Sequence, residues 1–148
     1  MKVAIFAHLL GAVIWIGGMF FAYHALRPAA ALLAPEQRLL LWAATLTRFF
    51  HWVWVSIALI LVSGFYMLTG IAGVARVPLN VHVMLYVGVI MTFIFGYVFL
   101  LPFSTLKHAV AAQDWRTGAT ALATIRKAVA VNLALGLVNI AVATMGRL

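Results

Sequence analysis

The side chains of this sequence that can do chemistry are mostly imidazoles, at His8, His24, His51, His82 and His108. The chain has no cysteine, and its only acidic residues are Glu36 and Asp114. This composition excludes disulfides, thiolate metal sites, cysteine nucleophiles and paired carboxylates for acid–base catalysis. Imidazole nitrogen binds haem iron and copper, so a haem or copper site held by histidine is the chemistry that remains.

The elements that position these histidines are long apolar segments. Of the 148 residues, 67% are hydrophobic and 8% are charged, and the mean hydropathy is +1.16. A helix that crosses a bilayer needs about 20 mostly apolar residues, and four stretches qualify, at residues 3–26, 49–68, 79–101 and 128–145. The sequence therefore predicts an all-α integral membrane protein, an antiparallel bundle of four transmembrane helices that forms one domain over residues 1–148.

Two of the connectors carry signals for the start of a helix. Pro35 and Glu36 place a proline and an acid in a first turn, and Asp114 is a favourable N-cap before Trp115. We expect residues 39–47 to extend the second span outside the bilayer, and the segment after Trp115 to lead into the fourth span.

The distribution of Lys and Arg predicts the orientation of the bundle. Connectors one and three hold seven basic residues, Arg27, Arg38, Arg48, Lys107, Arg116, Arg126 and Lys127. The termini and connector two hold only Lys2, Arg76 and Arg147. Basic connectors stay in the cytoplasm, so we expect a bacterial inner-membrane protein with both termini on the periplasmic side. We attribute the net charge of +8 to basic residues that set the topology and contact anionic lipid headgroups, and we expect no nucleic-acid partner.

The histidines sort by depth into two groups. His8 and His82 lie early in the first and third spans, and antiparallel packing places both near the outer surface, about one helical turn or less apart in depth. Two imidazoles from different helices can ligate a haem iron from both sides or hold a copper ion. His24, His51 and His108 fall at the cytoplasmic ends of their spans, where an interfacial role is expected and a second metal or haem site is the weaker alternative.

Small and aromatic residues accompany the outer pair. The face of the first span that carries His8 continues with Gly11, Trp15 and Gly18. On the third span, Tyr86 follows His82 by one turn. Such faces suit a flat porphyrin, and Arg76 is a candidate partner for the haem propionates. The alternative is that small residues are the ordinary packing surface of membrane helices.

Methionines favour a copper site as the alternative. Met67 and Met145 map near the outer surface, close in depth to His8 and His82, as do Met1 and Met84. Thioether and imidazole together form a soft ligand set that suits Cu(I). Methionine is also an ordinary filler of apolar cores.

The first span reads His8-Leu-Leu-Gly-Ala-Val-Ile-Trp-Ile-Gly-Gly-Met-Phe20, with Ser63-Gly64 in the second span and Asn132 and Gly136 in the fourth. This pattern resembles the CopD family of bacterial inner-membrane copper-resistance proteins over nearly the whole chain. The resemblance implies a copper permease or copper-binding protein, in which His8, His82 and the outer methionines receive the ion.

The first span is also similar to that of HemJ, a family of four-helix protoporphyrinogen oxidases, and Leu79-Asn-Val-His82 extends the similarity to the third span. This resemblance implies that His8 is a ligand of b-type haem and that His82 is its partner or a residue on the substrate side. The chain departs from the HemJ pattern at Val83, where the family has lysine, and at Asn132, where it has an acidic residue.

These observations favour a b-type haem protein that transfers electrons within the membrane. The haem would lie between the first and third spans, and a redox protein or a quinone would be the partner. A copper-binding or copper-transport protein of the CopD type is the alternative. A HemJ-like oxidoreductase and an accessory membrane subunit without a cofactor remain open, and the small residues also allow a homodimer.

Overall fold

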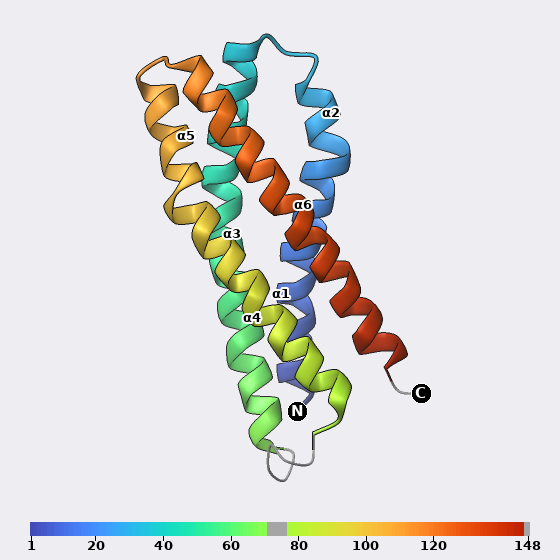
Figure 1. Cartoon of the computed structure of the whole chain (residues 1–148). Helices are drawn as coiled ribbons and strands as arrows, with labels where there is room; N and C mark the ends of the chain where they lie inside the picture. Colours follow the sequence, from blue (N-terminus) through green and yellow to red (C-terminus); the bar gives the residue numbers. More distant parts are fainter. Residues whose placement is uncertain (71–76, 147–148) are drawn as a thin grey trace.

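The computed structural model describes residues 1–70 and 77–146, and over these residues the chain is a series of helices joined by short turns. Four helical stretches are long and apolar enough to cross a membrane, Lys2–Ala30, Pro35–Gly70, Leu79–Ala111 and Trp115–Met145. They run alternately up and down the length of the molecule (Figure 1). The predicted all-α membrane fold with four spanning helices is therefore confirmed.

The first stretch continues through Arg27 and Pro28, where the sequence suggested that it would end. It consists of α1 (Lys2–Phe21), a π-helical turn η1 (Ala22–Leu26) and α2 (Arg27–Ala30). Proline lacks the N–H that would bond to the carbonyl of residue 24, and its ring crowds that carbonyl. A wider turn immediately before Pro28 relieves this conflict, so the helix bulges instead of breaking.

The two connectors with helix-start signals are parts of long helices. α3 (Pro35–Gly70) is one continuous helix, so residues 39–47 extend the second span as expected. α6 (Trp115–Met145) begins at Asp114, whose side chain accepts a hydrogen bond from the Thr117 backbone N–H at 3.1 Å. Hydrogen bonds from Thr117 also lower the pKa of this exposed carboxyl.

The third stretch is divided by a proline. α4 (Leu79–Leu100) starts directly after Pro78, and α5 (Pro102–Ala111) follows a bend at Leu101. Because Pro102 cannot donate a backbone hydrogen bond, the helix changes direction there. The bend lets α5 follow α6, which it contacts along its length.

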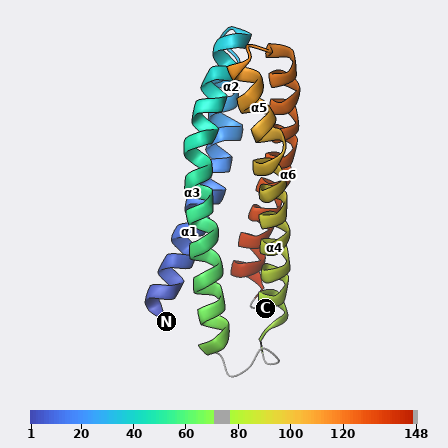
Figure 2. The ribbon, with the colours of Figure 1, turned by 90° about the vertical axis from the view of Figure 1, so that its left-hand side faces the viewer.

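The helices associate as two pairs. α1 packs along α3, and α4 with α5 packs along α6. Figure 2 shows the pairs as two layers, with α1 and α3 in one layer and α4, α5 and α6 in the other. The end of the bundle that contains Met1 and the α6 C-terminus is called the outer end below, and the opposite end the inner end (Figure 1).

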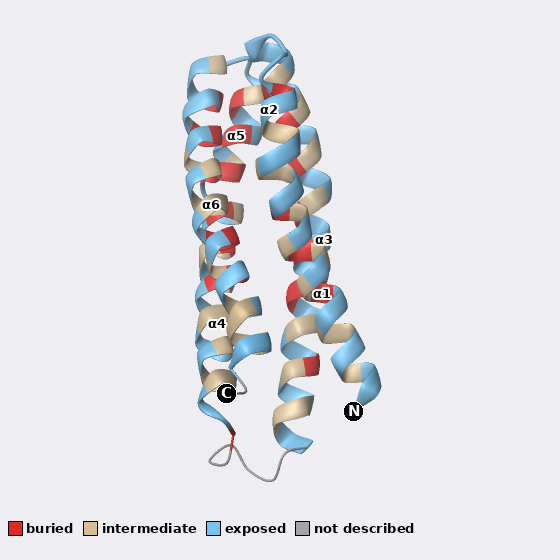
Figure 3. Cartoon of the chain, turned by 90° about the vertical axis from the view of Figure 1, so that its right-hand side faces the viewer, coloured by how far each residue is buried: buried red, intermediate tan, exposed pale blue. Residues whose placement is uncertain are grey.

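Aromatic side chains join the two layers at mid-height. The Phe95 ring of α4 lies 5.2 Å from Phe50 and 5.2 Å from Trp54 of α3, and 6.2 Å from Trp15 of α1. Buried residues gather at this level and toward the inner end, whereas the outer third of the bundle is mostly intermediate or exposed (Figure 3). The bundle is therefore closed in its middle and looser at its outer end.

Asparagine side chains hold α6 against α4. Asn132 donates to the Met91 carbonyl at 3.2 Å, and Asn139 donates to the Met84 carbonyl at 3.3 Å. Lipid offers no competing water, so such bonds help to fix helix pairs, each contributing around 1 kcal/mol.

Glycine allows α1 and α3 to approach closely. A Cβ added at Gly11 would lie 2.9 Å from both the Ser56 carbonyl oxygen and Ile60 Cγ1, and one added at Gly18 would overlap the Phe49 ring. A Cβ at Gly17 would meet no atom within 4 Å. The first two glycines therefore form the seam with α3, while Gly17 does not.

We expect Gly11→Ala to destabilise the bundle, because the backbone carbonyl of Ser56 has little freedom to move aside. The cost is about 1–3 kcal/mol for overpacking, measured by thermal unfolding of the detergent-solubilised protein. Gly17→Ala is the matched control, and its better helix propensity makes it neutral or stabilising by up to about 1 kcal/mol. Equal effects of the two substitutions would contradict the assignment of the seam.

Candidate metal site

His8 lies at the outer part of the seam between α1 and α3. Its Nδ1 atom is 3.1 Å from the Ile60 carbonyl oxygen and 3.1 Å from Ser63 Oγ. A Cβ added at Gly64 would sit 3.4 Å from His8 Cε1. The ring thus lies against a glycine of the neighbouring helix and is half-buried.

The partners of Nδ1 determine which ring nitrogen carries the proton. The Ser63 hydroxyl donates to the carbonyl of Leu59 in its own helix, so its oxygen is left as an acceptor toward His8. The Ile60 carbonyl can only accept. Both groups therefore require a proton on Nδ1, which leaves the Nε2 lone pair of a neutral ring available. Histidines that bind metals are commonly held in this way, with the other ring N–H donated to a carbonyl.

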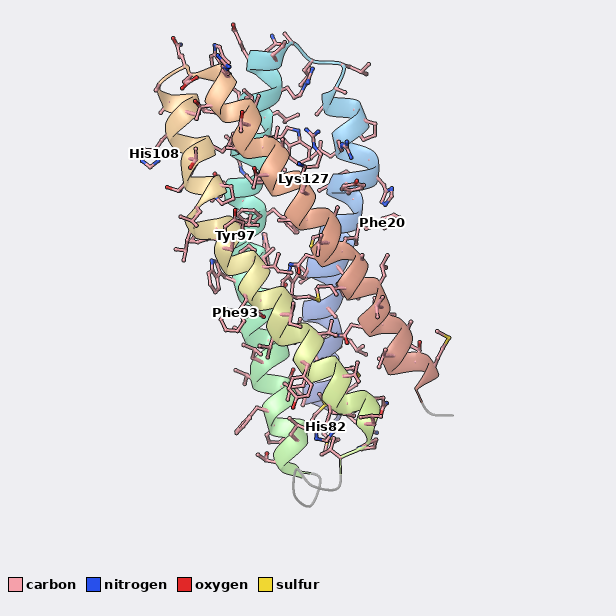
Figure 4. The ribbon with its side chains drawn as sticks, viewed as in Figure 1. Phe20, His82, Phe93, Tyr97, His108 and Lys127 are labelled. Atoms are coloured by element: carbon pink, nitrogen blue, oxygen red, sulfur yellow. The ribbon has the colours of Figure 1, made fainter. Side chains whose placement is uncertain are left out.

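The other histidines make no comparable contact with another helix within the described residues. Nδ1 of His82, His51 and His108 lies 3.3, 3.0 and 2.8 Å from the carbonyl four residues earlier in the chain. The His24 ring stacks at 4.6 Å on Phe20 of the preceding turn. His24, His51 and His108 are all exposed. His24 and His108 lie toward the inner end, where Figure 4 labels His108, and their exposure suits an interfacial position. His51 follows Phe50 near the middle of α3, so the prediction that it lies at the cytoplasmic end of its helix was wrong, because α3 continues inward to Pro35.

His8 and His82 lie on helices that belong to different layers. Two observations place residues of α1 and α4 at a common level. The Trp15 ring contacts the Phe95 ring, and Ile16 and Met91 both lie against Gly136 of α6. Counted outward from these levels at 1.5 Å per residue, His82 lies further out than His8 by about 2–9 Å. His82 is near the outer end of α4 (Figure 4). The two imidazoles have separate hydrogen-bond partners, His8 on α3 and His82 on the residue that precedes its own helix.

The residues expected to line a porphyrin have other neighbours. Side chains and backbone of α3 pack directly against Gly11 and Gly18, and Trp15 is buried against Phe95. On α4, Tyr86 is 66% exposed. Because α3 already packs on Gly11 and Gly18 and Phe95 packs on Trp15, these residues do not fit haem in the predicted slot. The glycine stripe is helix-packing surface, which was the alternative interpretation.

Methionine residues lie at the same end of the bundle as His8. Met67 is half-buried on α3, one turn beyond Gly64. A Cβ added at Gly70 would sit 3.2 Å from Met1 Cε, so the first residue of the chain folds against the end of α3. Met84 on α4 is partly buried, and Met145 is 65% exposed at the end of α6. Two imidazoles and several thioethers therefore share the outer end.

Acidic ligands are missing from this end. Within the described residues, no three side chains of the His, Cys, Asp and Glu types gather closely enough to hold a metal ion. A metal at the outer end would therefore depend on imidazole with sulfur rather than on carboxylates. Arg76 and Arg147, the two outer arginines, lie outside the described residues.

Sequence reasoning used Ser63-Gly64 only as part of the pattern that resembles the CopD family, and it did not connect Ser63 with His8. The adjacent Gly64, which leaves room for the imidazole ring, was the available signal.

The comparison with protein families gives one match. Residues 43–145 match the family model described as Copper resistance protein D, CopD. This range covers most of α3 and all of α4, α5 and α6, and it begins after α1, so the assignment of His8 rests on the geometry above. No curated protein and no solved structure matches the chain.

We expect His8 to carry its proton on Nδ1, because Ile60 and Ser63 of the neighbouring helix α3 accept a hydrogen bond from that atom. In ¹⁵N NMR spectra of the purified protein at neutral pH, its ring should report Nδ1–H, and Ser63→Ala should shift that resonance. His108 is the control, because its partner, Ser104, is in its own helix. A protonated Nε2 on His8 would rule out the proposed tautomer.

Proposed function

Because the chain belongs to the copper resistance protein D family, we propose that it is a membrane protein that binds copper near its outer end, with His8 Nε2 as a ligand. The observation that carries this proposal is the hydrogen bonding of Nδ1 to Ile60 and Ser63, which orients the ring and leaves Nε2 free. Copper is then the substrate of the protein, an ion that it receives and releases.

The methionines at the outer end favour Cu(I). Met67 lies one turn from Gly64, which supports the His8 ring, and Met1 reaches the same end of α3. Imidazole with thioether is a ligand set of the kind that selects Cu(I) over hard cations. His82 and Met84 on α4 are candidates for the remaining positions, and a shift of the looser outer third would bring the layers together.

The packed middle favours binding and transfer at one surface over a path through the bundle. Trp15, Phe50 and Phe95 are each at most 4% exposed at mid-height, and they provide no ligand for an ion. We infer that copper is received and released on the outer side and does not pass through the bundle to the inner end.

The orientation follows from the basic residues. Seven of the ten Lys and Arg residues belong to the connectors at the inner end, and such connectors are retained in the cytoplasm. We therefore propose an inner-membrane location with the His8 end facing the periplasm.

The experiment is a titration of the detergent-purified protein with Cu(I) against a competing chelator. His8→Ala should weaken binding by at least about tenfold, and Ser63→Ala should weaken it by about tenfold because the ring loses its support. His108→Ala removes an exposed imidazole at the other end and should leave the affinity unchanged.

Two results would overturn the copper assignment. One is an unchanged affinity in His8→Ala. The other is a Soret band in the visible spectrum of the purified wild-type protein that disappears in His8→Ala, which would restore the haem interpretation.

A further inference from the structure

Three arginines from three helices converge at the inner end. Arg27 of α2 and Arg126 of α6 line one small cavity, together with Tyr23 of η1 and Trp42 of α3. Arg38 of α3 is close enough to Arg126 to repel it, as is Arg27. The cluster of Arg27, Arg38 and Arg126 is called the arginine cluster below.

Carboxylates do not neutralise the arginine cluster. The chain has only two acidic side chains, Glu36 and Asp114, and the charged and polar groups that act on Arg126 are Arg27, Arg38 and the Tyr23 phenol. Arg38 donates through Nη2 to the Leu33 carbonyl at 3.1 Å, but its buried Nε has no partner among the described residues. The mutual repulsion of these guanidinium groups is a cost that a bound anion would reduce.

Arg126 differs in exposure from Lys127, the next residue in the sequence. Arg126 is half-buried against the cavity, whereas Lys127 is exposed; Figure 4 labels Lys127 on α6. A basic residue that only reaches toward headgroups would be expected to extend outward as Lys127 does. The inward position of Arg126 therefore calls for a ligand at the cavity.

The shape and lining of the cavity limit what this ligand is. Its volume is about 30 Å³, which is enough for a small polar group such as a phosphate oxygen. Apart from Tyr23, Arg27 and Arg126, the lining is apolar, with Trp42 and Ile125 among its walls. The site thus offers guanidinium groups for an oxyanion beside a surface for hydrocarbon.

The π-helical turn contributes to this arrangement. The wider turn at Ala22–Leu26 keeps Tyr23 and Arg27, four residues apart, on the cavity side, and the Arg27 guanidinium lies 5.0 Å from the centre of the Tyr23 ring. π turns within helices occur often at functional sites. Stacking on Tyr23 restricts the guanidinium before any ligand arrives.

We propose that the arginine cluster is a binding site for the phosphate of an anionic phospholipid in the cytoplasmic leaflet. One phosphate oxygen would enter the cavity between Arg27 and Arg126, and an acyl chain would follow the apolar wall. Guanidinium is suited to this because it forms paired hydrogen bonds with phosphate oxygens. The same oxygens are present in free phosphate, but the apolar wall and the position at the end of the spanning helices favour the lipid.

The test compares thermal unfolding of the full-length protein in micelles with added phosphatidylglycerol or added phosphatidylcholine. Phosphatidylglycerol should raise the Tm of the wild type by about 3 °C or more relative to phosphatidylcholine. Arg126→Gln should lose this shift, and Lys127→Gln, which removes the same charge from the adjacent residue, should keep it. In phosphatidylcholine alone, Arg126→Gln should be at least as stable as the wild type, because one repelling charge is gone.

Arg126→Lys provides a second measurement that keeps the charge. It should lose most of the shift, because an ammonium group cannot make the paired hydrogen bonds. Equal loss of the shift in Arg126→Gln and Lys127→Gln would mean that only general surface charge is involved. A full shift produced by inorganic phosphate in phosphatidylcholine micelles would assign the site to a free anion. Either result, or no shift with phosphatidylglycerol, overturns the proposal.

Discussion

The close seam between α1 and α3 is the constraint on which the outer site depends. At Gly11 the backbone of one helix reaches the Ser56 carbonyl of the other, a distance that no larger residue permits. This approach sets the register in which His8, less than one turn further out, meets Ser63 and Ile60. In lipid, where apolar surface gains little from leaving its surroundings, such close backbone packing and polar contacts are what hold helices together. The same interaction therefore stabilises the pair and orients the imidazole.

The two ends of the bundle are built for different tasks. The middle and inner parts hold the aromatic layer around Phe95 and most of the buried side chains, while the outer third keeps its interior residues only partly covered. A half-covered imidazole at the same end as several methionines is suited to exchange an ion with its surroundings. The arginine cluster lies on the opposite side of the packed layer, at the level expected for headgroups. The proposed copper site and the proposed lipid site are thus separated by a closed core and can be tested independently.

Much of the architecture could be predicted, and the site could be predicted in part. The four spans follow from apolar length, and the helix starts at Pro35 and Asp114 follow from capping chemistry. The orientation in the membrane stays a prediction from the positions of Lys and Arg. The predicted end of the first span at residue 26 was wrong, because the helix accommodates Pro28 through the π-helical turn Ala22–Leu26. The depth of His8 was accessible from helical rise, but the direction of its ring was not. A stripe of glycine, tryptophan and glycine fits a porphyrin or another helix equally well, and only the position of α3 distinguishes them.

By itself, the sequence determined that this chain lies in a membrane as four helices, which end carries the positive charge, and that histidine, methionine and arginine are the available functional groups. These properties depend on composition and on local spacing along a helix. The tertiary structure decided that α1 pairs with α3, that Ser63 is the partner of His8, and that Arg27, Arg38 and Arg126 converge. Those pairings join residues as far apart as 55 positions in the case of His8 and Ser63, and they depend on how side chains fit at each helix contact. Periodicity within one helix contains no information about which neighbour its faces will meet.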